Sequence, residues 1–390
     1  MSSLTAPVKR MRIGWLTYGV DRPLSGISRQ ALELGRALGR REDCELVYLT
    51  PYRRGPFRQE ANSDTFHLAG CGRLPAMMLL GGVAIAIAAR HRRLDLVHDP
   101  SGIAPFPFGR PIAPFRRVVT IHDAIGFRYP AGYPWLNRLL QRRYLPAMLP
   151  NVDAVITVSR HARADLERFL PRLPPPAHVV PPALSAQFYP VSEQDRRPVL
   201  ARLGLRRPYI LSVAAMQERK NLRRLVRAFA RLHAHRPEYQ LVLAGPTLWR
   251  YTPLGDEIEQ GGLAPHVVIP GYVADADLAA LYSGAALFVF PSRYEGFGLP
   301  VLEAMACATP VVCSNTSSLP EAAGDAAFLV DPTDTEALAA AMRRVLDDAP
   351  LADRLRQAGT ARARLFSWDH AAAQTAAVYR QLLGTAAPPT

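Results

Sequence analysis

Residues 285–312 read AALFVFPSRYEGFGLPVLEAMACATPVV. The run at 285–291 is almost entirely apolar, which is typical of a central strand in a parallel sheet. Residues 292–298 form a polar loop, and a helix begins at Leu299-Pro300, because proline in the first turn loses no hydrogen bond. A second strand is expected at 310–313. The order strand, loop, helix, strand predicts an α/β fold with a parallel sheet.

The same alternation runs through the chain as two series of similar size. The first series predicts strands at 12–17, 45–49, 94–98, 117–121, 154–158 and 178–180, with helices at 27–40 and 159–170, the second capped by Ser159. The second predicts strands at 209–213, 240–244, 267–269, 287–290 and 310–313, with helices that begin near Asn221, Asp275, Pro300 and Asp334. A proline-rich stretch, VVPPALSAQFYP, separates them. We therefore expect two doubly wound domains, residues 1–185 and 186–365, with the active site in a cleft between them.

Length and composition agree with this organisation. The chain has 390 residues, of which 49% are apolar and 21% charged, so we expect a soluble globular protein with more than one core. Its four cysteines, Cys44, Cys71, Cys307 and Cys313, have no metal-site spacing and indicate a reducing compartment. The N-terminus has no apolar signal core, so a cytoplasmic location is predicted. The apolar run at 75–89 is too short to span a bilayer and predicts a buried helix.

The charge is concentrated in the first half. Residues 1–190 hold 26 Lys+Arg and 13 Asp+Glu, whereas residues 191–390 hold 21 and 20, for a net charge of +14. A basic first half suggests contact with an anionic surface or partner. The alternative is that these charges simply lie on a solvent-exposed face. Arginine supplies every Lys+Arg charge except those of Lys9 and Lys220.

Two carboxylates of the opening stretch, Glu295 and Glu303, lie on either side of the point where the loop becomes a helix. A helix N-terminus is an anion site, and Gly296 and Gly298 allow the backbone to approach a ligand closely. The carboxylates are too far apart to share a proton. A nucleotide sugar suits them, with Glu303 at the ribose, Glu295 at the sugar and backbone N–H groups at the diphosphate. Alternatively, Glu303 complements the helix dipole and Glu295 is a solvated loop acid.

A second polar segment, Arg219-Lys220-Asn221, follows another predicted strand. Arg219 and Lys220 could neutralise a diphosphate, the first through its planar fork and the second as a point charge. Asn221 is expected to cap the helix that follows. Since lysine is so scarce here, we favour a function for Lys220.

These motifs resemble glycosyltransferase family 4, whose members are retaining nucleotide-sugar transferases of the GT-B fold. The resemblance rests on EGFGLPVLEA, on the ERKN segment and on PGYVADADLAALYSGA at 270–285. In the first half, VVTIHDAIGFRYPAGYP and VDAVITVSRHARADL are similar to the mannosyltransferase-like branch. The tail at 366–390 contains FSWDHAAAQTAAVYRQLL, which is similar to the closing helix that crosses back onto the first domain of this family.

The resemblance implies roles for individual residues. Arg219 and Lys220 would hold the donor diphosphate, and Glu295 would contact the donor sugar near His122. Further donor contacts would come from the backbone of Phe297, Gly298, Leu299 and Val273, from Glu303 at the ribose and from Gly26 near the phosphates. The family pattern usually has a second glycine before Gly26, where this chain has Ser25, and a glycine followed by arginine where it has Ala214-Ala215.

The resemblance implies a metal-independent hexosyltransferase with no cofactor beyond its nucleotide-sugar co-substrate, for which we favour GDP-mannose over UDP-sugars. The acidic pair Asp275 and Asp277 is expected to cap a helix rather than to bind a metal. The acceptor would be a saccharide or a lipid-linked saccharide used in bacterial surface polysaccharide or glycolipid synthesis. The segment NRLLQRRYLPAML at 137–149 mixes arginines with apolar residues, which suggests peripheral contact with an anionic membrane.

Two other classes of function are weaker. A non-transferring nucleotide-sugar enzyme, such as an epimerase, would need acid and base groups at the sugar ring, and His122 is the only candidate. A nucleic-acid-binding protein would explain the charge, but the sequence has no zinc spacing, no recognition helix and no basic stripe with interleaved aromatics. We therefore expect no nucleic-acid partner.

Overall fold

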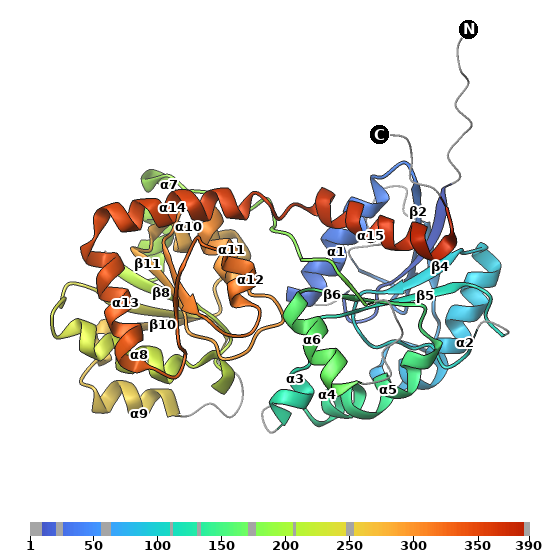
Figure 1. Cartoon of the computed structure of the whole chain (residues 1–390), viewed down its shortest axis with the longest axis horizontal. Helices are drawn as coiled ribbons and strands as arrows, with labels where there is room; N and C mark the ends of the chain where they lie inside the picture. The colour runs from blue at the N-terminus through green and yellow to red at the C-terminus, as the bar shows by residue number, and fades with distance from the viewer. Residues whose placement is uncertain are drawn as a thin grey trace, which may run out of the picture. The chain divides into compact units, whose positions relative to one another are not determined.

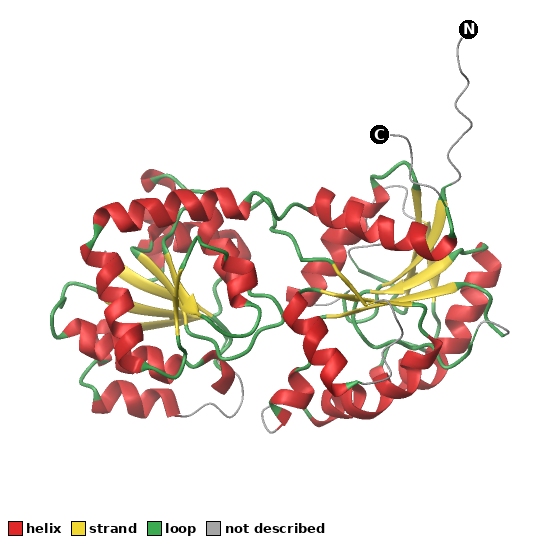
Figure 2. Ribbon diagram, viewed as in Figure 1, coloured by secondary structure: helices red, strands yellow, loops and turns green. Residues whose placement is uncertain are grey.

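The computed structural model describes residues 10–20, 26–55, 64–109, 112–130, 134–170, 177–205, 208–246 and 253–385. The chain divides into two compact units (Figure 1). Unit 1 comprises Met1–Ala183 and Ser367–Thr390, and unit 2 comprises Leu184–Phe366. In each unit, helices cover both faces of a parallel sheet (Figure 2).

The sheet of unit 1 has seven strands in the order β3-β2-β1-β4-β5-β6-β7. Their bounds are β1 Met11–Leu16, β2 Cys44–Thr50, β3 Asp64–His67, β4 Leu96–Asp99, β5 Arg116–Ile121, β6 Ala154–Thr157 and β7 Ala177–Val179. Successive side chains of a strand point to opposite faces, so Trp15 packs into one core and Leu16 into the other. Both faces of the sheet are therefore buried, as the apolar strands require.

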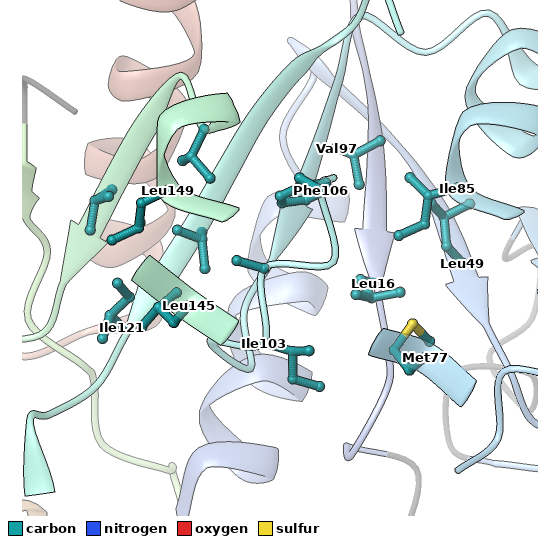
Figure 3. Packing of buried hydrophobic residues seen from close by; sticks show 14 of the residues in the cluster. Leu16, Leu49, Met77, Ile85, Val97, Ile103, Phe106, Ile121, Leu145 and Leu149 are labelled. Carbon is teal, nitrogen blue, oxygen red and sulfur yellow. The ribbon is translucent and has the colours of Figure 1, made fainter. Parts of the chain in front are cut away.

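Helices close the two faces of this sheet with different parts of the chain. One face packs against α2 (Leu74–Arg92) and the segment from α4 (Trp135–Leu139) to α5 (Leu145–Met148), with Met77, Phe106 and Leu145 in the core (Figure 3). The other face packs against α1 (Gly26–Gly39) and α15 (Trp368–Leu383). The remaining helices are α3 Ile125–Arg128, the π-helix η3 Leu140–Tyr144, η4 Leu149–Asn151 and α6 Arg160–Phe169.

The last helix, α15, belongs to unit 1 although unit 2 precedes it in the chain. Tyr379 is fully buried, and its hydroxyl lies 2.5 Å from Nδ1 of His98 on β4. Arg380 forms an ion pair with the buried Asp43 beside β2. The chain therefore returns to its first unit through a packed, hydrogen-bonded helix.

The sheet of unit 2 has six strands in the order β10-β9-β8-β11-β12-β13. Their bounds are β8 Tyr209–Val213, β9 Gln240–Ala244, β10 Val267–Gly271, β11 Leu287–Phe290, β12 Val311–Ser314 and β13 Phe328–Val330. The helices and short turns are α7 Glu193–Arg202, η5 Glu218–Lys220, α8 Leu222–His233, α9 Pro253–Gln260, η6 Ala264–His266, α10 Asp275–Gly284, α11 Leu299–Ala306, α12 Leu319–Ala323, α13 Thr335–Asp347 and α14 Ala349–Ala363. The strand order reverses between β8 and β11, so the loops that follow these two strands meet at one edge, where open α/β sheets bind ligands.

The α/β fold with two doubly wound units is confirmed. All eleven predicted strands are present within a few residues of the expected bounds, and Ser159 caps α6 by accepting a hydrogen bond from the N–H of Ala162 at 2.9 Å. Two short edge strands, β3 and β13, were not predicted. Residues 64–67 are only half buried, and the strand at 328–330 has only three residues. Neither strand therefore gives a long apolar run.

The prediction of a buried helix at 75–89 is wrong in part. Helix α2 buries Met77, Ile85 and small residues against the sheet, but Leu79 is 79% exposed and Leu80, Val83 and Ile87 are each about half exposed. Among the described helices, α2 alone has the length and composition of a membrane-spanning helix, and a third of its most apolar stretch is buried. The helix therefore covers the sheet with one side and leaves an apolar stripe on the other.

Candidate functional site

The loops after β8 and β11 bring three predicted site residues into contact. The Nζ atom of Lys220 lies 2.6 Å from Oε1 of Glu295, and Nη1 of Arg219 lies 3.0 Å from Oε2 of the same carboxylate. Lys220 and Glu295 are both buried, while Arg219 is partly exposed. One carboxylate therefore holds two cations at the switch point of the sheet.

Asn221 joins the two loops, but it does not cap α8 as predicted. Its backbone is left-handed, with φ of 60°, and the side chain makes no cap hydrogen bond. Instead, Nδ2 donates to the carbonyl oxygens of Pro291 at 3.0 Å and Pro332 at 2.8 Å. An N-cap needs a side-chain oxygen that accepts from the helix, whereas here the amide nitrogen is used as a donor. The N–H of Arg293 also donates to the carbonyl of Arg219 at 2.8 Å, so hydrogen bonds cross-link the two loops in addition to the ion pairs of Glu295.

Serines fix the position of Glu295. Oγ of Ser292 donates to Oε1 of Glu295 at 2.6 Å, and Ser317 accepts from the Glu295 N–H at 2.8 Å. Ser318 donates to the carbonyls of Glu295 and Phe297. Burial alone would raise the pKa of Glu295, but the charges of Lys220 and Arg219, with hydrogen bonds from Lys220 and Ser292, outweigh it and hold this pKa below its usual value. The carboxylate is therefore ionised at neutral pH.

The N-terminus of α11 supplies the backbone groups of the site. Gly298 precedes the helix with φ of 115°, and a Cβ there would lie 2.6 Å from Cδ2 of Leu319. None of the described residues accepts a hydrogen bond from the N–H groups of Phe297, Gly298 or Leu299. Such N–H groups, at the positive end of the helix dipole, attract an anion.

Glu303 lies one turn along α11. Its Oε2 accepts a hydrogen bond from the hydroxyl of the fully buried Tyr282 at 2.8 Å, and the side chain is partly exposed. Val273 is buried in the turn between β10 and α10. Both belong to the same unit as Lys220.

The acids at 275 and 277 do not cap α10 as predicted. The N-cap position belongs to Ala274, which makes no side-chain cap bond, and both acids lie in the first turn. Asp277 accepts from Nη2 of Arg202 at 2.7 Å. Within the described ranges, no three His, Cys, Asp or Glu side chains gather as a metal site would require.

Two of the predicted site residues belong to unit 1. His122 directly follows β5, and its Nε2 lies 2.8 Å from the carbonyl of Pro100. A carbonyl oxygen only accepts, so Nε2 carries the proton and Nδ1 is left as an acceptor. Burial lowers the pKa of His122, which is therefore neutral at pH 7. Gly26 begins α1 and is exposed, with nothing within 4 Å of an added Cβ, and Ser25 lies outside the described residues.

Some residues that shape the site were not singled out from the sequence. They are Ser292, Ser317 and Ser318 around Glu295, Tyr282 beside Glu303, and Asp99 near His122. Asp99 is fully buried at the end of β4 and accepts hydrogen bonds from Ser101 and Ala104. The segment HDPSG after an apolar strand was the available signal for Asp99, whereas serines in a loop are too common to stand out.

The geometry suits a bound anion with hydroxyl groups beside it. Lys220, Arg219 and the start of α11 supply positive charge at one sheet edge, and Glu295 and Glu303 supply hydrogen-bond acceptors on the same unit. A diphosphate carries the charge that the first group attracts, and a sugar or ribose carries the hydroxyls that the second group accepts from.

Two family models together match most of the chain. Residues 24–188 match "Glycosyltransferase Family 4" and residues 197–362 match "Glycosyl transferases group 1". A relative from Escherichia coli, the O-antigen chain mannosyltransferase B, is 33% identical over 387 residues, which covers 95% of this chain and 100% of the relative. An MMP alpha-(1->4)-mannosyltransferase from Mycolicibacterium hassiacum is 31% identical and covers 78% of this chain and 74% of its own. Among solved structures, sucrose-phosphate synthase from Thermosynechococcus elongatus aligns with a TM-score of 0.74 at 26% identity, over 96% of this chain and 100% of that one.

Proposed function

Because the chain belongs to glycosyltransferase family 4 and has the GT-B fold, we propose that it transfers mannose from GDP-mannose, with retention of configuration and without a metal ion. The acceptor in this proposal is a saccharide or lipid-linked saccharide of a bacterial surface polysaccharide or glycolipid. The relatives named as mannosyltransferases support mannose, and O-antigen synthesis by one of them supports the acceptor class. They do not favour the epimerase alternative. The observation that carries the proposal is the meeting of Lys220, Arg219 and the α11 N-terminus at one sheet edge.

The chemical step places its largest demand on the leaving group. As the bond from the anomeric carbon to the phosphate oxygen breaks, negative charge grows on the nucleoside diphosphate. Lys220, Arg219 and the N–H groups at 297–299 stabilise this charge, and they are already fixed in position before the reaction.

Glu295 has a double role in this proposal. In the free protein it forms ion pairs with both Lys220 and Arg219, so neither cation lacks a partner, and the three side chains together keep one positive charge for a donor. When a diphosphate takes over those cations, Glu295 becomes available as an acceptor for the sugar hydroxyls. Glu303 holds the ribose hydroxyls, with Tyr282 orienting it, and the backbone of Val273 holds the base.

The acceptor side belongs to unit 1. His122 is neutral, and its Nδ1 can accept a hydrogen bond from a sugar hydroxyl near the anomeric carbon. The acceptor hydroxyl attacks the face from which the diphosphate leaves and passes its proton to the departing phosphate oxygen. The new glycosidic bond therefore forms on the side where the old bond breaks, which preserves the anomeric configuration.

Membrane contact, the second part of the proposal, is supported by the surface of unit 1. The apolar stripe of α2, defined by Leu79, Leu80, Val83 and Ile87, is exposed. Exposed arginines lie at the two ends of this helix, at the N-cap Arg73, at Arg90 and at the C-cap Arg93. Two more, Arg142 and Arg143, lie on η3, which is joined to α2 by a hydrogen bond from Tyr144 to the carbonyl of Met78. In the segment at 137–149, by contrast, Leu140, Leu145 and Leu149 are buried. Apolar groups beside arginines suit an anionic lipid surface on the cytoplasmic side.

The test of the transfer is an assay with the full chain. Labelled GDP-mannose, UDP-glucose and UDP-galactose are each incubated with a bacterial lipid extract, with and without a chelator. The proposal predicts transfer of label from GDP-mannose alone, unaffected by the chelator, and an unchanged anomeric configuration in the product by NMR. Isomerised free nucleotide sugar without transfer would contradict it.

The membrane part has its own test. Sedimentation with vesicles containing anionic phospholipid is compared for the wild type, for a variant with Leu79, Val83 and Ile87 replaced by Gln, and for a control with the exposed Leu329 and Leu365 of unit 2 replaced by Gln. Binding that salt weakens, that the α2 variant loses and that the control keeps is the expected result. Equal sedimentation of all three proteins would refute a role for the α2 stripe.

A further inference from the structure

A second group of cations lies in unit 2, on residues to which the proposed function gives no role. A pocket of about 110 Å³ is lined by Glu218, Asn221, Arg223, Arg224, Arg227 and Arg293. Its walls come from η5, the first turns of α8 and the loop after β11. Since a water molecule occupies about 30 Å³ of liquid, the pocket has room for several waters or for one small anion.

Two of its four arginines have no carboxylate partner among the residues that the structure describes. Glu257 on α9 accepts ion pairs from Arg223 and Arg227. Within the described ranges, Arg224 and Arg293 form no ion pair, and the buried Nε atom of each has no hydrogen-bond partner. Arg224 uses one Nη atom to donate to the carbonyl of Pro332. Two cations of the pocket are therefore not paired with a carboxylate of the described residues.

The arginines of the pocket also repel one another. Burial, followed by the charges of Arg293 and Arg227, lowers the pKa of Arg224, and the exposed Asp331 and Asp334 offset this only in part. An anion in the pocket would relieve the repulsion. Arginine forks match the oxygens of a tetrahedral oxyanion, because two parallel N–H groups can bind two oxygens.

We propose that this pocket binds a phosphate group, either as free phosphate or as the phosphate of a small ester. The site is separate from the Lys220–Glu295 pair, since its arginines bind Glu257 and Pro332 and not Glu295. It nevertheless uses the same two loops: Glu218 lies in η5 together with Lys220, and the N–H of Arg293 donates to the carbonyl of Arg219. An occupant therefore contacts both of these loops and stabilises the folded unit.

The inference is tested by the binding of inorganic phosphate and of glycerol 3-phosphate to the full chain, by calorimetry at constant ionic strength. The proteins compared are the wild type, Arg293→Met, Arg224→Met and a control, Arg343→Met, which changes an exposed arginine on α13. Loss of one charged donor is expected to raise the dissociation constant about tenfold or more in each pocket variant, with no change in the control. If the wild type binds inorganic phosphate more tightly than glycerol 3-phosphate, the ligand is the free ion. If it binds glycerol 3-phosphate more tightly, the ligand is an ester.

Phosphate could also bind beside Lys220, so a further variant separates the two sites. Arg219→Met weakens the donor site and should leave phosphate binding at the pocket unchanged. If Arg219→Met abolishes phosphate binding while Arg293→Met does not, or if no protein binds either ligand, the inference is overturned. Because the readout is phosphate binding and not transfer, its result does not depend on the proposed function.

Discussion

Lys220 and Glu295 are separated by 75 positions in the sequence, and their side chains form a buried ion pair with 2.6 Å between Nζ and Oε1. The parallel sheet explains this contact, because β8 and β11 are neighbours and their carboxyl ends open on the same edge. The pair keeps a lysine charged inside the unit before any donor arrives. A diphosphate can then replace the carboxylate as the partner of an existing cation.

Lys220→Met is expected to destabilise the protein by about 2 kcal/mol. This is less than the loss for a fully unpaired buried charge, since Arg219 remains beside Glu295. The double variant Lys220→Met/Glu295→Gln removes both charges and should recover to within about 1 kcal/mol of the wild type. Urea unfolding at neutral pH measures both values. A double variant as unstable as the single one would show that the pair is not the source of the loss.

Gly298→Ala should cost about 1–3 kcal/mol and weaken donor binding. The residue has φ of 115°, and the new Cβ would lie 2.6 Å from Leu319, so α11 or its neighbour must shift. Gly255→Ala is the matched control, because that glycine lies in α9 with nothing within 4 Å and should gain about 0.5–1 kcal/mol. Thermal unfolding compares the two. Equal effects would rule out a special role for the Gly298 backbone.

Tyr282→Phe removes the hydrogen bond that orients Glu303. We expect the dissociation constant of the nucleotide sugar to rise about 5-fold, the equivalent of about 1 kcal/mol for the loss of one hydrogen bond. Tyr189→Phe, at an exposed tyrosine of the same unit, should have no effect. Calorimetric titration is the measurement. An unchanged dissociation constant in Tyr282→Phe would show either that Glu303 does not contact the donor or that Tyr282 does not orient it.

The buried His98 should make unit 1 sensitive to acid. Its ring lies between the hydroxyls of Tyr379 and Thr120, and burial, with a smaller effect from His122, lowers its pKa from 6.5 to about 3. Between these two pH values the unfolded chain binds a proton that the folded chain does not. The free energy of unfolding therefore falls by about 1.4 kcal/mol for each pH unit of acidification.

The variant His98→Gln should remove this contribution and flatten the pH dependence of the urea midpoint below pH 6.5. His370→Gln changes an exposed histidine of α15 and serves as the control. If the slope of His98→Gln equals that of the wild type, the buried ring is not the group that titrates.

The fold could be predicted from the sequence because its strands are buried on both faces. β8, β9 and β11 are mostly apolar, with Ser212 and Gln240 as the only polar residues in the three strands, and their predicted bounds match the structure. β3 could not be found in this way, because an edge strand with half-buried residues has no such pattern. The exposure of Leu79 on α2 could not be predicted either, because the sequence of a helix that is apolar on all sides does not indicate which side packs against the sheet.

The site could be predicted only as far as its location. A loop at the carboxyl end of a buried strand, followed by a helix with proline in its first turn, identified the edge of the sheet. The partners within it depend on tertiary contacts. Asn221 has the residue type of a helix cap, yet its left-handed backbone turns the side chain toward Pro291 and Pro332. Likewise, no local signal indicated that Ser292 would donate to Glu295.

The central claim, that a donor diphosphate binds beside Lys220, is tested most directly by the dissociation constant of GDP-mannose for Arg219→Met. This variant leaves the Lys220–Glu295 pair in place, so the unit should remain folded. The account predicts that the constant rises about tenfold or more relative to the wild type, while Arg343→Met binds normally. Unchanged GDP-mannose binding in Arg219→Met would contradict it.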